Sequence, residues 1–426
     1  MSSLAHGIMI PPDNKRVRHD NHEENEDRLS DLPDGVLLHI LSFLNSKHAV
    51  QTCVLSPRWK NLWKHIPTLT LHSSEFTNAK KLGMFVTKIL TLRDTSASLH
   101  TLDFERIGAF EPQKTLKEIL NYVCSHNTQL KQLGIRVKGD SSIIFPHISS
   151  CQGLTSLKLC VCPKVWERTL FPKSLNLPLL TCLDLTDFAF CASDNADHAE
   201  PFSSFNSLNN LIISSCTVMD ASILKISSAT LVKLTMLNNS SDFTKIELAA
   251  PSLYTITFYG IPYQRLCGSS LSSVKQVKID ADISTRFEEV SLILFSWLQE
   301  LDKIKSLTVT ASTLQILSLV PDLFKVKLPS LLCNLKTLKV KLKPLPIRLR
   351  KISQSAMFKN MSRKEACKMR KARAYPFFTI PEGIVDILFQ NSPSREVDIT
   401  DYRSSYQNVQ WVEIDLKTVI INGGYS

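Results

Sequence analysis

Eleven cysteines and eleven histidines are the residues of this chain best suited to metal or thiol chemistry. Cys160-Val161-Cys162 brings two cysteines close together, but its spacing is one residue too tight for the usual C-x-x-C of a zinc site. The histidines are dispersed and form neither H-E-x-x-H nor a deaminase-type pattern, and His39 is predicted to be a half-exposed helix residue. We therefore expect structural thiols and no metal site.

Patterns for nucleophilic or phosphate chemistry are also missing from the sequence. There is no G-x-S-x-G and no glycine-rich phosphate loop, and only 12 glycines are present to build one. Serine pairs such as Ser214-Ser215 are predicted to be turn residues beside strands. The sequence predicts no catalytic residue, no cofactor and no enzymatic activity.

Length and composition restrict the class of protein further. The chain has 426 residues, of which 43% are hydrophobic and 21% charged, which excludes collagen-like and wholly disordered classes. The most apolar stretches, Gly35–Leu44 and Val290–Leu298, are much shorter than the roughly 20 residues of a membrane helix. No secretory signal is recognisable, and an odd number of cysteines favours a reducing compartment. We expect a soluble protein of the nucleus and/or cytoplasm.

The formal net charge of +11 comes from one segment. Residues 336–373 hold fourteen Lys and Arg against one acidic residue, a balance of +13, so the remainder of the chain sums to −2. We interpret residues 341–376 as a solvated basic insertion, with binding of a polyanion or inositol phosphate as the alternative. Residues 1–27 are predicted to be a disordered tail, whose short basic run (Lys15, Arg16, Arg18) is an alternative nuclear signal.

Residues 28–67 carry the pattern of three short helices. Pro33 suits the first turn of a helix, where its missing N–H costs nothing. One apolar face then follows at helical spacing: Val36, Leu37, Ile40, Leu41 and Leu44. Asn45 and Ser46 can cap a second helix.

Ser56-Pro57 predicts the start of a third helix in the same segment. Along it, four apolar residues are spaced i, i+3, i+4 and i+7: Trp59, Leu62, Trp63 and Ile66. On spacing alone, we predict that Trp59 and Trp63 serve the core of this module, with anchoring of a partner as the alternative.

A repeat of the form apolar-x-x-apolar-x-apolar occupies residues 68–426. Its ten copies begin at residues 99, 130, 154, 180, 208, 231, 253, 274, 304 and 335, with separations of 21 to 31 residues. The shorter periods match a leucine-rich repeat, and the longer ones leave room for a helix on the convex side. A β-sandwich would repeat about every 8–12 residues. We therefore predict a mixed α/β fold: three short helices followed by a curved solenoid.

The ninth position of the repeat supports this interpretation in part. It holds Cys162, Cys216 and Asn239, which fit the N/C position of leucine-rich repeats. We predict that Cys162 and Cys216 are buried and unpaired, with side chains bonded to the backbone. Beyond the tenth copy, residues 382–390 and 396–400 predict a final helix and strand that cap the array.

Leu29–Ile66 resembles the F-box, most clearly at Leu32-Pro33, at residues 40–44 and at residues 54–63. With the repeats behind it, the chain is similar to plant F-box/leucine-rich-repeat proteins. The segment PSLLCNLKTLKVKLKPLP resembles only the start of the FBD segment of many such proteins, so no FBD segment is assigned. This resemblance implies that the chain binds a Skp-type adaptor, and through it a cullin, as the substrate-recognition subunit of an SCF ubiquitin ligase.

The same resemblance implies which residues contact the adaptor. They are Leu32, Pro33, Ile40, Leu41, Leu44, Val54, Leu55, Ser56, Arg58, Trp59, Leu62 and Trp63. Two other functions stay open: a receptor gated by a small molecule in a pocket of the concave face, and a scaffold whose F-box serves no ligase.

The repeat domain is expected to hold an unknown protein substrate on its strands. Since successive side chains of a strand alternate between faces, Leu133 and Ile135 are predicted to point inward. The predicted outward-facing substrate contacts are Arg136, Lys158, Asp184, Tyr259, Lys278 and Asp280. Membrane partners are not expected, and nucleic acid is disfavoured.

Overall fold

The computed structural model describes thirteen stretches of the chain: residues 32–106, 108, 113–126, 129–138, 141–162, 168–192, 197–284, 287–320, 332, 334–343, 349, 380–389 and 396–401. The predicted tail at 1–27 and most of the predicted basic insertion at 341–376 lie outside these residues. Within the described ranges, no helix combines the length and apolar character needed to cross a lipid bilayer.

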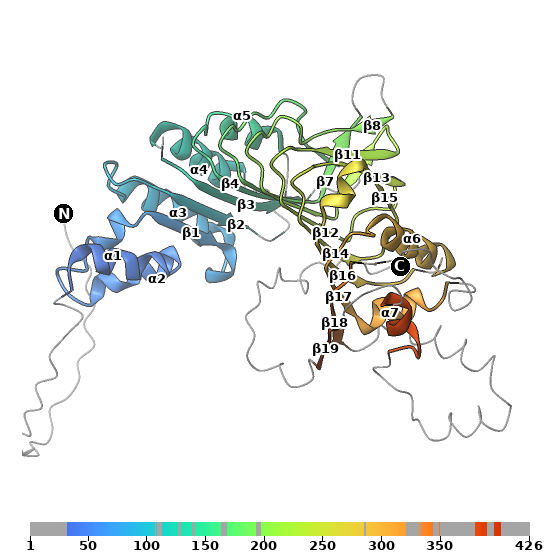
Figure 1. Cartoon of the computed structure of the whole chain (residues 1–426). Helices are drawn as coiled ribbons and strands as arrows, with labels where there is room; N and C mark the ends of the chain where they lie inside the picture. Colours follow the sequence, from blue (N-terminus) through green and yellow to red (C-terminus); the bar gives the residue numbers. More distant parts are fainter. Residues whose placement is uncertain are drawn as a thin grey trace, which may run out of the picture.

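Four short helical elements form the N-terminal module (Figure 1): α1 (Asp34–Ser42), α2 (Ser46–Gln51), η1 (Thr52–Val54) and η2 (Leu62–His65). The side chain of Asn45 caps α2 by accepting a hydrogen bond from the His48 N–H at 2.8 Å. This cap agrees with the sequence prediction, because an Asn oxygen satisfies an N–H group that has no partner within the helix.

The predicted third helix is wrong as an α-helix. After Ser56 the backbone makes successive i to i+3 hydrogen bonds, from Trp59 N–H to the Ser56 carbonyl at 3.1 Å and from Leu62 N–H to the Trp59 carbonyl at 3.3 Å. The segment is therefore a series of turns that leads into the 3₁₀-helix η2. Short helices depend on tertiary packing, and here packing of Trp59, Leu62 and Trp63 into the core overrides the helical start signal.

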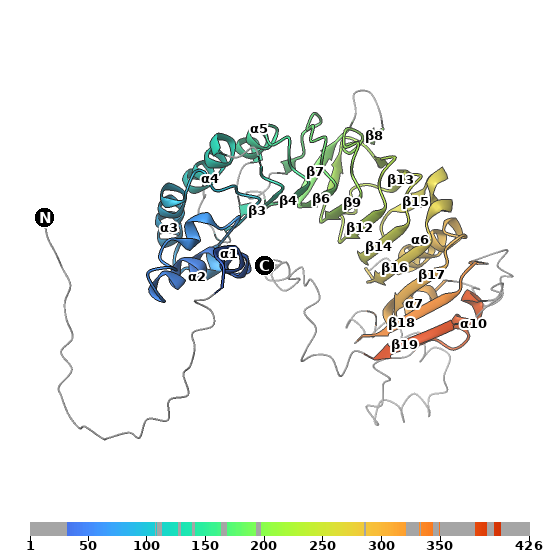
Figure 2. The ribbon, with the colours of Figure 1, turned by 60° about the vertical axis from the view of Figure 1, so that its left-hand side comes forward.

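Twelve parallel strands form one continuous sheet along the concave side of the solenoid (Figure 2). In spatial order they are β1 (Thr68–His72), β2 (Thr101–Glu105), β3 (Gln132–Lys138), β4 (Ser156–Cys162), β6 (Cys182–Thr186), β9 (Asn210–Ser214), β12 (Lys233–Leu237), β14 (Thr255–Gly260), β16 (Gln276–Ala281), β17 (Ser306–Thr310), β18 (Thr337–Leu342) and β19 (Glu396–Asp401). Each of the ten predicted repeat copies supplies one strand, which begins two residues after the first apolar residue of the copy.

The convex layer changes with the length of the repeat. Helices or 3₁₀ turns cover the two ends: η3 (Ser73–Glu75), α3 (Ala79–Leu92), α4 (Gln113–His126), η4 (Ser141–Ile143), α5 (Ile144–Ile148), α6 (Phe287–Glu300), α7 (Ala311–Leu317) and α10 (Ile384–Leu388). The copies separated by 30 or 31 residues are those that carry α4, α6 and α7, as the sequence predicts.

Two small parallel sheets replace the helices in the middle of the convex layer. One consists of β5 (Thr169–Leu170), β7 (Phe188–Cys191) and β10 (Thr217–Met219). The other consists of β8 (His198–Ala199), β11 (Ile223–Ser227), β13 (Lys245–Ala249) and β15 (Arg265–Cys267), followed by η5 (Ser269–Ser273). Shorter repeats have too few residues for a helical crossover, so an extended segment closes each turn of the solenoid.

One hydrophobic core runs without interruption from the N-terminal module through the solenoid. Ile66 and Leu69, on either side of the junction, are fully buried. The Thr70 N–H of β1 donates to the buried Ser46 hydroxyl at 2.9 Å, and Lys47 Nζ donates to the Glu75 carbonyl at 2.6 Å. The module is therefore fixed to the first strand by both core packing and hydrogen bonds.

Left-handed corners end three successive concave strands. Asp187, Ser215 and Asn238 have φ values of 66°, 52° and 45°, and each N–H donates to a carbonyl of the following strand at 2.8–3.0 Å. Asp, Asn and Ser are residues whose short polar side chains suit turn conformations of this kind.

The ninth repeat position behaves differently among the three copies that hold Cys or Asn there. Cys216 is buried and unpaired as predicted, its N–H donates to Asn239 Oδ1 at 3.2 Å, and burial raises the pKa of its thiol to about 12. Cys162 is unpaired but only half-buried, and its thiol donates to the Asp187 side chain at 3.6 Å instead of to the backbone. The prediction of a buried ladder residue is therefore wrong for Cys162.

Candidate functional site

Helix α1 is apolar on two faces. Leu37 and Leu41, one turn apart, are fully buried against the core. Val36, Ile40 and Phe43, spaced i, i+4 and i+7, form a second row that is exposed, with 76% of Phe43 accessible. A surface helix normally keeps its apolar residues on the face toward the core, so the exposed apolar row of α1 is typical of a surface that a partner covers.

The end of η1 adds two more exposed apolar residues. Val54 is 83% accessible and Leu55 is 65% accessible. Together with four residues at α1, they make up a set of exposed apolar residues that we call the F-box apolar surface: Val36, Ile40, Phe43, Leu44, Val54 and Leu55. Large apolar side chains exposed in this number within 20 residues are the kind of feature that marks interaction sites.

The predicted adaptor contacts fall into three classes of burial. Pro33, Ile40, Leu44, Val54, Leu55 and Arg58 are exposed. Leu32 and Ser56 are half-buried, and Leu32 packs against the core. Leu41, Trp59, Leu62 and Trp63 are buried, so the prediction that both tryptophans serve the core is confirmed. Substitution of any of these four buried residues would change adaptor binding indirectly, by disturbing the fold of the module.

Two exposed residues, Val36 and Phe43, are missing from the predicted contacts. The apolar positions of α1 cover an arc too wide for one buried face, and that width is the signal that could have separated an inner row from an outer row. Only packing decides which row faces the core, because both rows have helical spacing.

Arg58 fixes the start of α1. Its Nε and one terminal nitrogen donate to Asp34 Oδ1 at 3.0 and 2.7 Å, and the guanidinium also donates to the Leu32 carbonyl. This fork holds the beginning of α1 against the turns that follow Ser56. Both charged side chains are exposed, so the contact contributes orientation more than stability.

All six predicted substrate contacts lie on the concave face. Lys158, Asp184 and Lys278 belong to the central outward row of the sheet, while the other three belong to the next row: Arg136, Tyr259 and Asp280. The inward predictions for Leu133 and Ile135 are confirmed by their burial. The register of the parallel strands thus brings residues from distant copies onto one surface.

The six residues are not equally available to a partner. The Asp184 side chain is only 13% accessible and lies 3.9 Å from Lys158 Nζ, and burial raises its pKa. Arg136 lies 3.6 Å from Glu105, and Asp280 accepts hydrogen bonds from Thr310 and Lys343. Among the predicted contacts, Tyr259 and Lys278 are the most exposed members of the C-terminal half.

A histidine–aspartate pair joins β1 to β2 at the start of the concave face. His72 Nε2 lies 3.0 Å from Asp103 Oδ2. A β-carbon on Gly134, in the neighbouring strand, would collide with the Asp103 carboxylate, so glycine makes room for the pair. The hydrogen bond to Asp103 raises the pKa of His72. For Asp103, burial acts to raise the pKa, but the hydrogen bond and the electrostatic attraction to His72 outweigh burial, so the pKa of Asp103 is lowered.

This pair predicts a pH-dependent contact between the first two strands of the solenoid. The raised pKa of His72 gives stability that is complete below about pH 6.5 and is lost as pH rises through the folded value. The lowered pKa of Asp103 gives stability that is complete above about pH 3.9 and is lost at lower pH. The stability difference between wild type and His72→Gln should therefore shrink as pH rises above about 6.5, by less than about 1 kcal/mol for this half-exposed pair. Urea melts of both proteins would measure it, and a difference that grows with pH would contradict the assignment.

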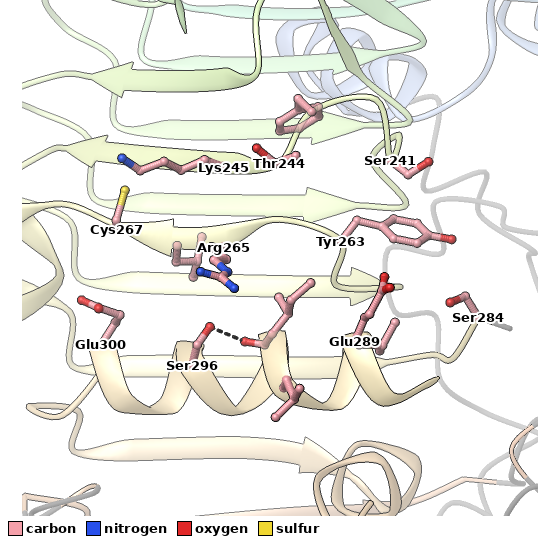
Figure 3. Close-up of a pocket in the computed structure, with 15 residues that line it drawn as sticks. Ser241, Thr244, Lys245, Tyr263, Arg265, Cys267, Ser284, Glu289, Ser296 and Glu300 are labelled. Carbon is pink, nitrogen blue, oxygen red and sulfur yellow. Dashed lines mark hydrogen bonds between the residues drawn. The ribbon is translucent and has the colours of Figure 1, made fainter. Parts of the chain in front are cut away.

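A pocket of about 1260 Å³ lies on the convex side, between the strands β13 and β15 and helix α6 (Figure 3). Lys245, Arg265, Tyr263, Glu289 and Glu300 line it with mixed charge. The pocket lies where the convex layer changes from short strands to a full helix, and the strands β13 and β15 and the helix α6 do not fill the space between them. Because this pocket is not on the concave face, it lends no support to a small-molecule receptor of the predicted kind.

Comparison with known proteins gives one domain match and several distant relatives. The F-box domain model matches residues 29–70. An FBD-associated F-box protein of Arabidopsis thaliana is 25% identical over 362 residues, 76% of this chain and 74% of its own length. An F-box/FBD/LRR-repeat protein of the same plant is 28% identical over 309 residues, 68% of this chain and 62% of its own. F-box/LRR-repeat protein 13 of A. thaliana is 26% identical over 323 residues, 71% of this chain and 69% of its own.

Proposed function

Starting from an F-box domain in a chain distantly homologous to Arabidopsis F-box/FBD/LRR-repeat proteins, we propose that the protein is the substrate-recognition subunit of an SCF-type ubiquitin ligase. F-box proteins typically serve such ligases as non-catalytic subunits that recruit the substrate. In this role a Skp-type adaptor binds the F-box and connects it to a cullin. The observation that carries the proposal is the F-box apolar surface, which remains exposed beside a fully packed core.

The fold suits a subunit that positions its substrate and does no chemistry. Core packing and the hydrogen bonds of Ser46 and Lys47 fix the F-box to the solenoid. A substrate held by the strands would therefore keep a defined position relative to the adaptor. Rigid placement raises the effective concentration of the substrate near the ubiquitin-charged enzyme.

The proposed substrate surface is the concave sheet, and its charge changes along the solenoid. The N-terminal strands carry His72, Asp103 and Glu105 in paired contacts. The central strands present uncharged side chains such as Thr235 and Thr257. The C-terminal strands add three lysines to the outward rows: Lys278, Lys339 and Lys341. Lys339 lies 3.9 Å from Asp398 and Asp280 pairs with Lys343, so the C-terminal end carries mixed charge. This surface is complementary to a protein segment with mixed charge at its ends and an uncharged middle.

Substitution of Tyr259 and Lys278 tests this surface. In cells treated with a proteasome inhibitor, a Tyr259→Ala/Lys278→Glu variant should lose proximity labelling of the substrate. The first substitution removes an aromatic anchor, and the second reverses a charge. The matched control is Lys88→Glu, on the exposed side of the convex helix α3. A labelled proteome unchanged by the double substitution would exclude this half of the concave face.

Reconstitution tests the ligase function itself. The purified chain should bind a Skp-type adaptor, bring down a cullin through it, and promote ubiquitin transfer to a captured protein. Failure to bind any such adaptor at micromolar concentration would refute the proposal. Binding of adaptor without cullin would favour the scaffold hypothesis instead.

A further inference from the structure

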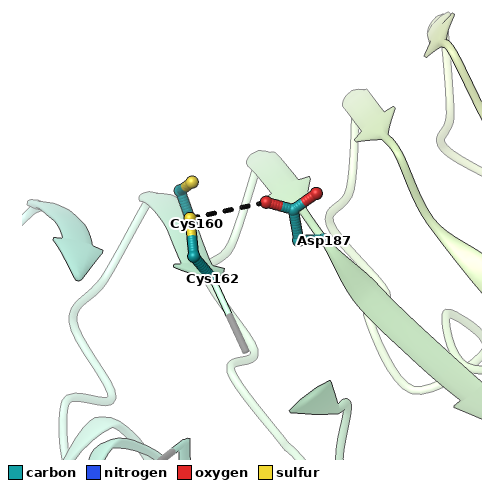
Figure 4. A group of neighbouring side chains, drawn as sticks. All are labelled: Cys160, Cys162 and Asp187. Atoms are coloured by element: carbon teal, nitrogen blue, oxygen red, sulfur yellow. Dashed lines mark hydrogen bonds between the residues drawn. The ribbon is translucent and has the colours of Figure 1, made fainter. Parts of the chain in front are cut away.

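A thiol–carboxylate cluster lies where β4 ends, formed by Cys160, Cys162 and Asp187 (Figure 4). The two cysteines are alternate residues of one strand, so their side chains leave the same face of the sheet. Asp187 comes from the left-handed corner that follows the adjacent strand β6. The two sulfurs and a carboxylate oxygen all lie within 4.8 Å of one another.

The backbone does not require this combination of side chains. Ser215 and Asn238 occupy the equivalent corners of the next repeats, so the corner tolerates neutral residues. Cys216 and Asn239 show the structural use of the ninth position, a backbone-to-side-chain bond between neighbouring turns of the solenoid. Cys162 instead contacts the next turn through its thiol and the Asp187 carboxylate. Placing a carboxylate beside two thiols in a partly buried position costs free energy unless something compensates it.

The donor set fits a cation that prefers sulfur. Two thiolates and a carboxylate match the ligands that zinc takes in proteins, with a fourth position left for water or for a donor from a partner. The Arg136 guanidinium attracts all three groups electrostatically, so a divalent cation together with Arg136 would balance their charge. Zinc–sulfur bonds of about 2.3 Å require the donors to move closer by about 1 Å, which rotation of the cysteine side chains supplies.

We propose that Cys160, Cys162 and Asp187 bind one divalent cation of the zinc class at the rim of the concave face. A disulfide is the competing use of the two thiols. Alternate Cα atoms of an extended strand are about 6.6 Å apart, which is at the upper limit for a disulfide bridge. The metal site therefore suits the strand geometry better, and it does not depend on the proposed ligase function.

Cobalt(II) provides a direct probe of the site. The full-length chain, reduced and stripped of metal with a chelator, should take up one equivalent of Co²⁺. The complex should show the intense thiolate-to-cobalt absorption of a tetrahedral site, and Zn²⁺ should bleach it. Cys162→Ser and Asp187→Asn should each weaken Co²⁺ binding at least about tenfold, the lower end of what even outer-shell changes cost. Asn tolerates the left-handed corner, so the Asp187 variant keeps the fold.

Two controls make the experiment decisive. Cys191→Ser, which removes a free half-buried thiol of β7 outside the cluster, should leave Co²⁺ binding unchanged. In the wild-type chain, Cd²⁺ should slow alkylation of Cys160 and Cys162 but leave alkylation of the exposed Cys124 unaffected. Absence of the absorption in wild type, its persistence in Cys160→Ser/Cys162→Ser, or recovery of a Cys160–Cys162 disulfide from the native protein would overturn the proposal.

Discussion

Replacing both Phe43 and Leu55 with alanine is expected to abolish capture of a Skp-type adaptor while the chain stays folded. Both side chains are more than half exposed and contribute little to the core. Truncation of an interface anchor costs at least about 2 kcal/mol, roughly thirty-fold in dissociation constant. Two independent anchors would together weaken binding roughly a thousand-fold. Titration of the purified variant with adaptor, followed by calorimetry, measures the loss directly.

The matched control for this experiment lies on the convex helix α3. Met84 and Leu92 are apolar residues outside the F-box apolar surface that are also more than half exposed. A Met84→Ala/Leu92→Ala variant should bind adaptor as wild type does. If the Phe43/Leu55 variant melted as wild type and still bound adaptor with unchanged affinity, the F-box apolar surface would not be the docking site.

Leu32 and Pro33 are less suitable than Phe43 and Leu55 as positions for testing adaptor docking by substitution. Leu32 packs against the core, and its carbonyl accepts a hydrogen bond from Arg58. The Pro33 carbonyl accepts the first hydrogen bonds of α1, from the N–H groups of Val36 and Leu37. Changes at these two positions would mix loss of contact with disturbance of the helix start, which Phe43 and Leu55 avoid.

Leu41→Ala is expected to destabilise the F-box module by about 2–5 kcal/mol, the usual cost of removing a fully buried leucine side chain. Adaptor binding should weaken as a consequence, and saturating adaptor should restore part of the lost stability, because the adaptor binds only the folded module. Hydrogen exchange of α1, α2 and β1 amides measures the local stability.

The neighbouring residue Ile40 provides the control for Leu41. It belongs to the exposed row of α1, so Ile40→Ala should change stability by no more than about 0.5 kcal/mol while weakening adaptor binding. The opposite pattern, with Leu41→Ala stable but unable to bind adaptor, would show that Leu41 is a contact residue and that the assignment of the two helix faces is wrong.

The sequence by itself determined the positions of the concave strands. Every repeat copy has an apolar residue before the strand and two within it, such as Leu154, Leu157 and Leu159, and all three are fully buried. This information is local, because the alternation of a strand is visible in consecutive residues. The caps of the first helices, such as Asn45, are local in the same way. The longest repeat periods likewise predicted the helices of the convex layer.

Tertiary structure decided which faces of these elements are free. Both rows of α1 have helical spacing, and only packing against Trp63 and its neighbours in the core leaves Phe43 outside. The same packing converted the predicted third helix into turns and a 3₁₀-helix. Short segments take their conformation from contacts with residues distant in sequence, and a local pattern does not contain those contacts.

The thiol–carboxylate cluster is the clearest case of what sequence alone did not determine. Cys160 and Cys162 were visible as a pair too tight for ordinary zinc spacing, and Cys162 was predicted to fill a buried ladder position. Asp187 lies 25 residues away along the chain. It reaches the pair only because parallel strands β4 and β6 align in register and a left-handed corner turns its carboxylate toward Cys162. Register and corner geometry arise when the solenoid closes, since they depend on backbone hydrogen bonds between successive repeats.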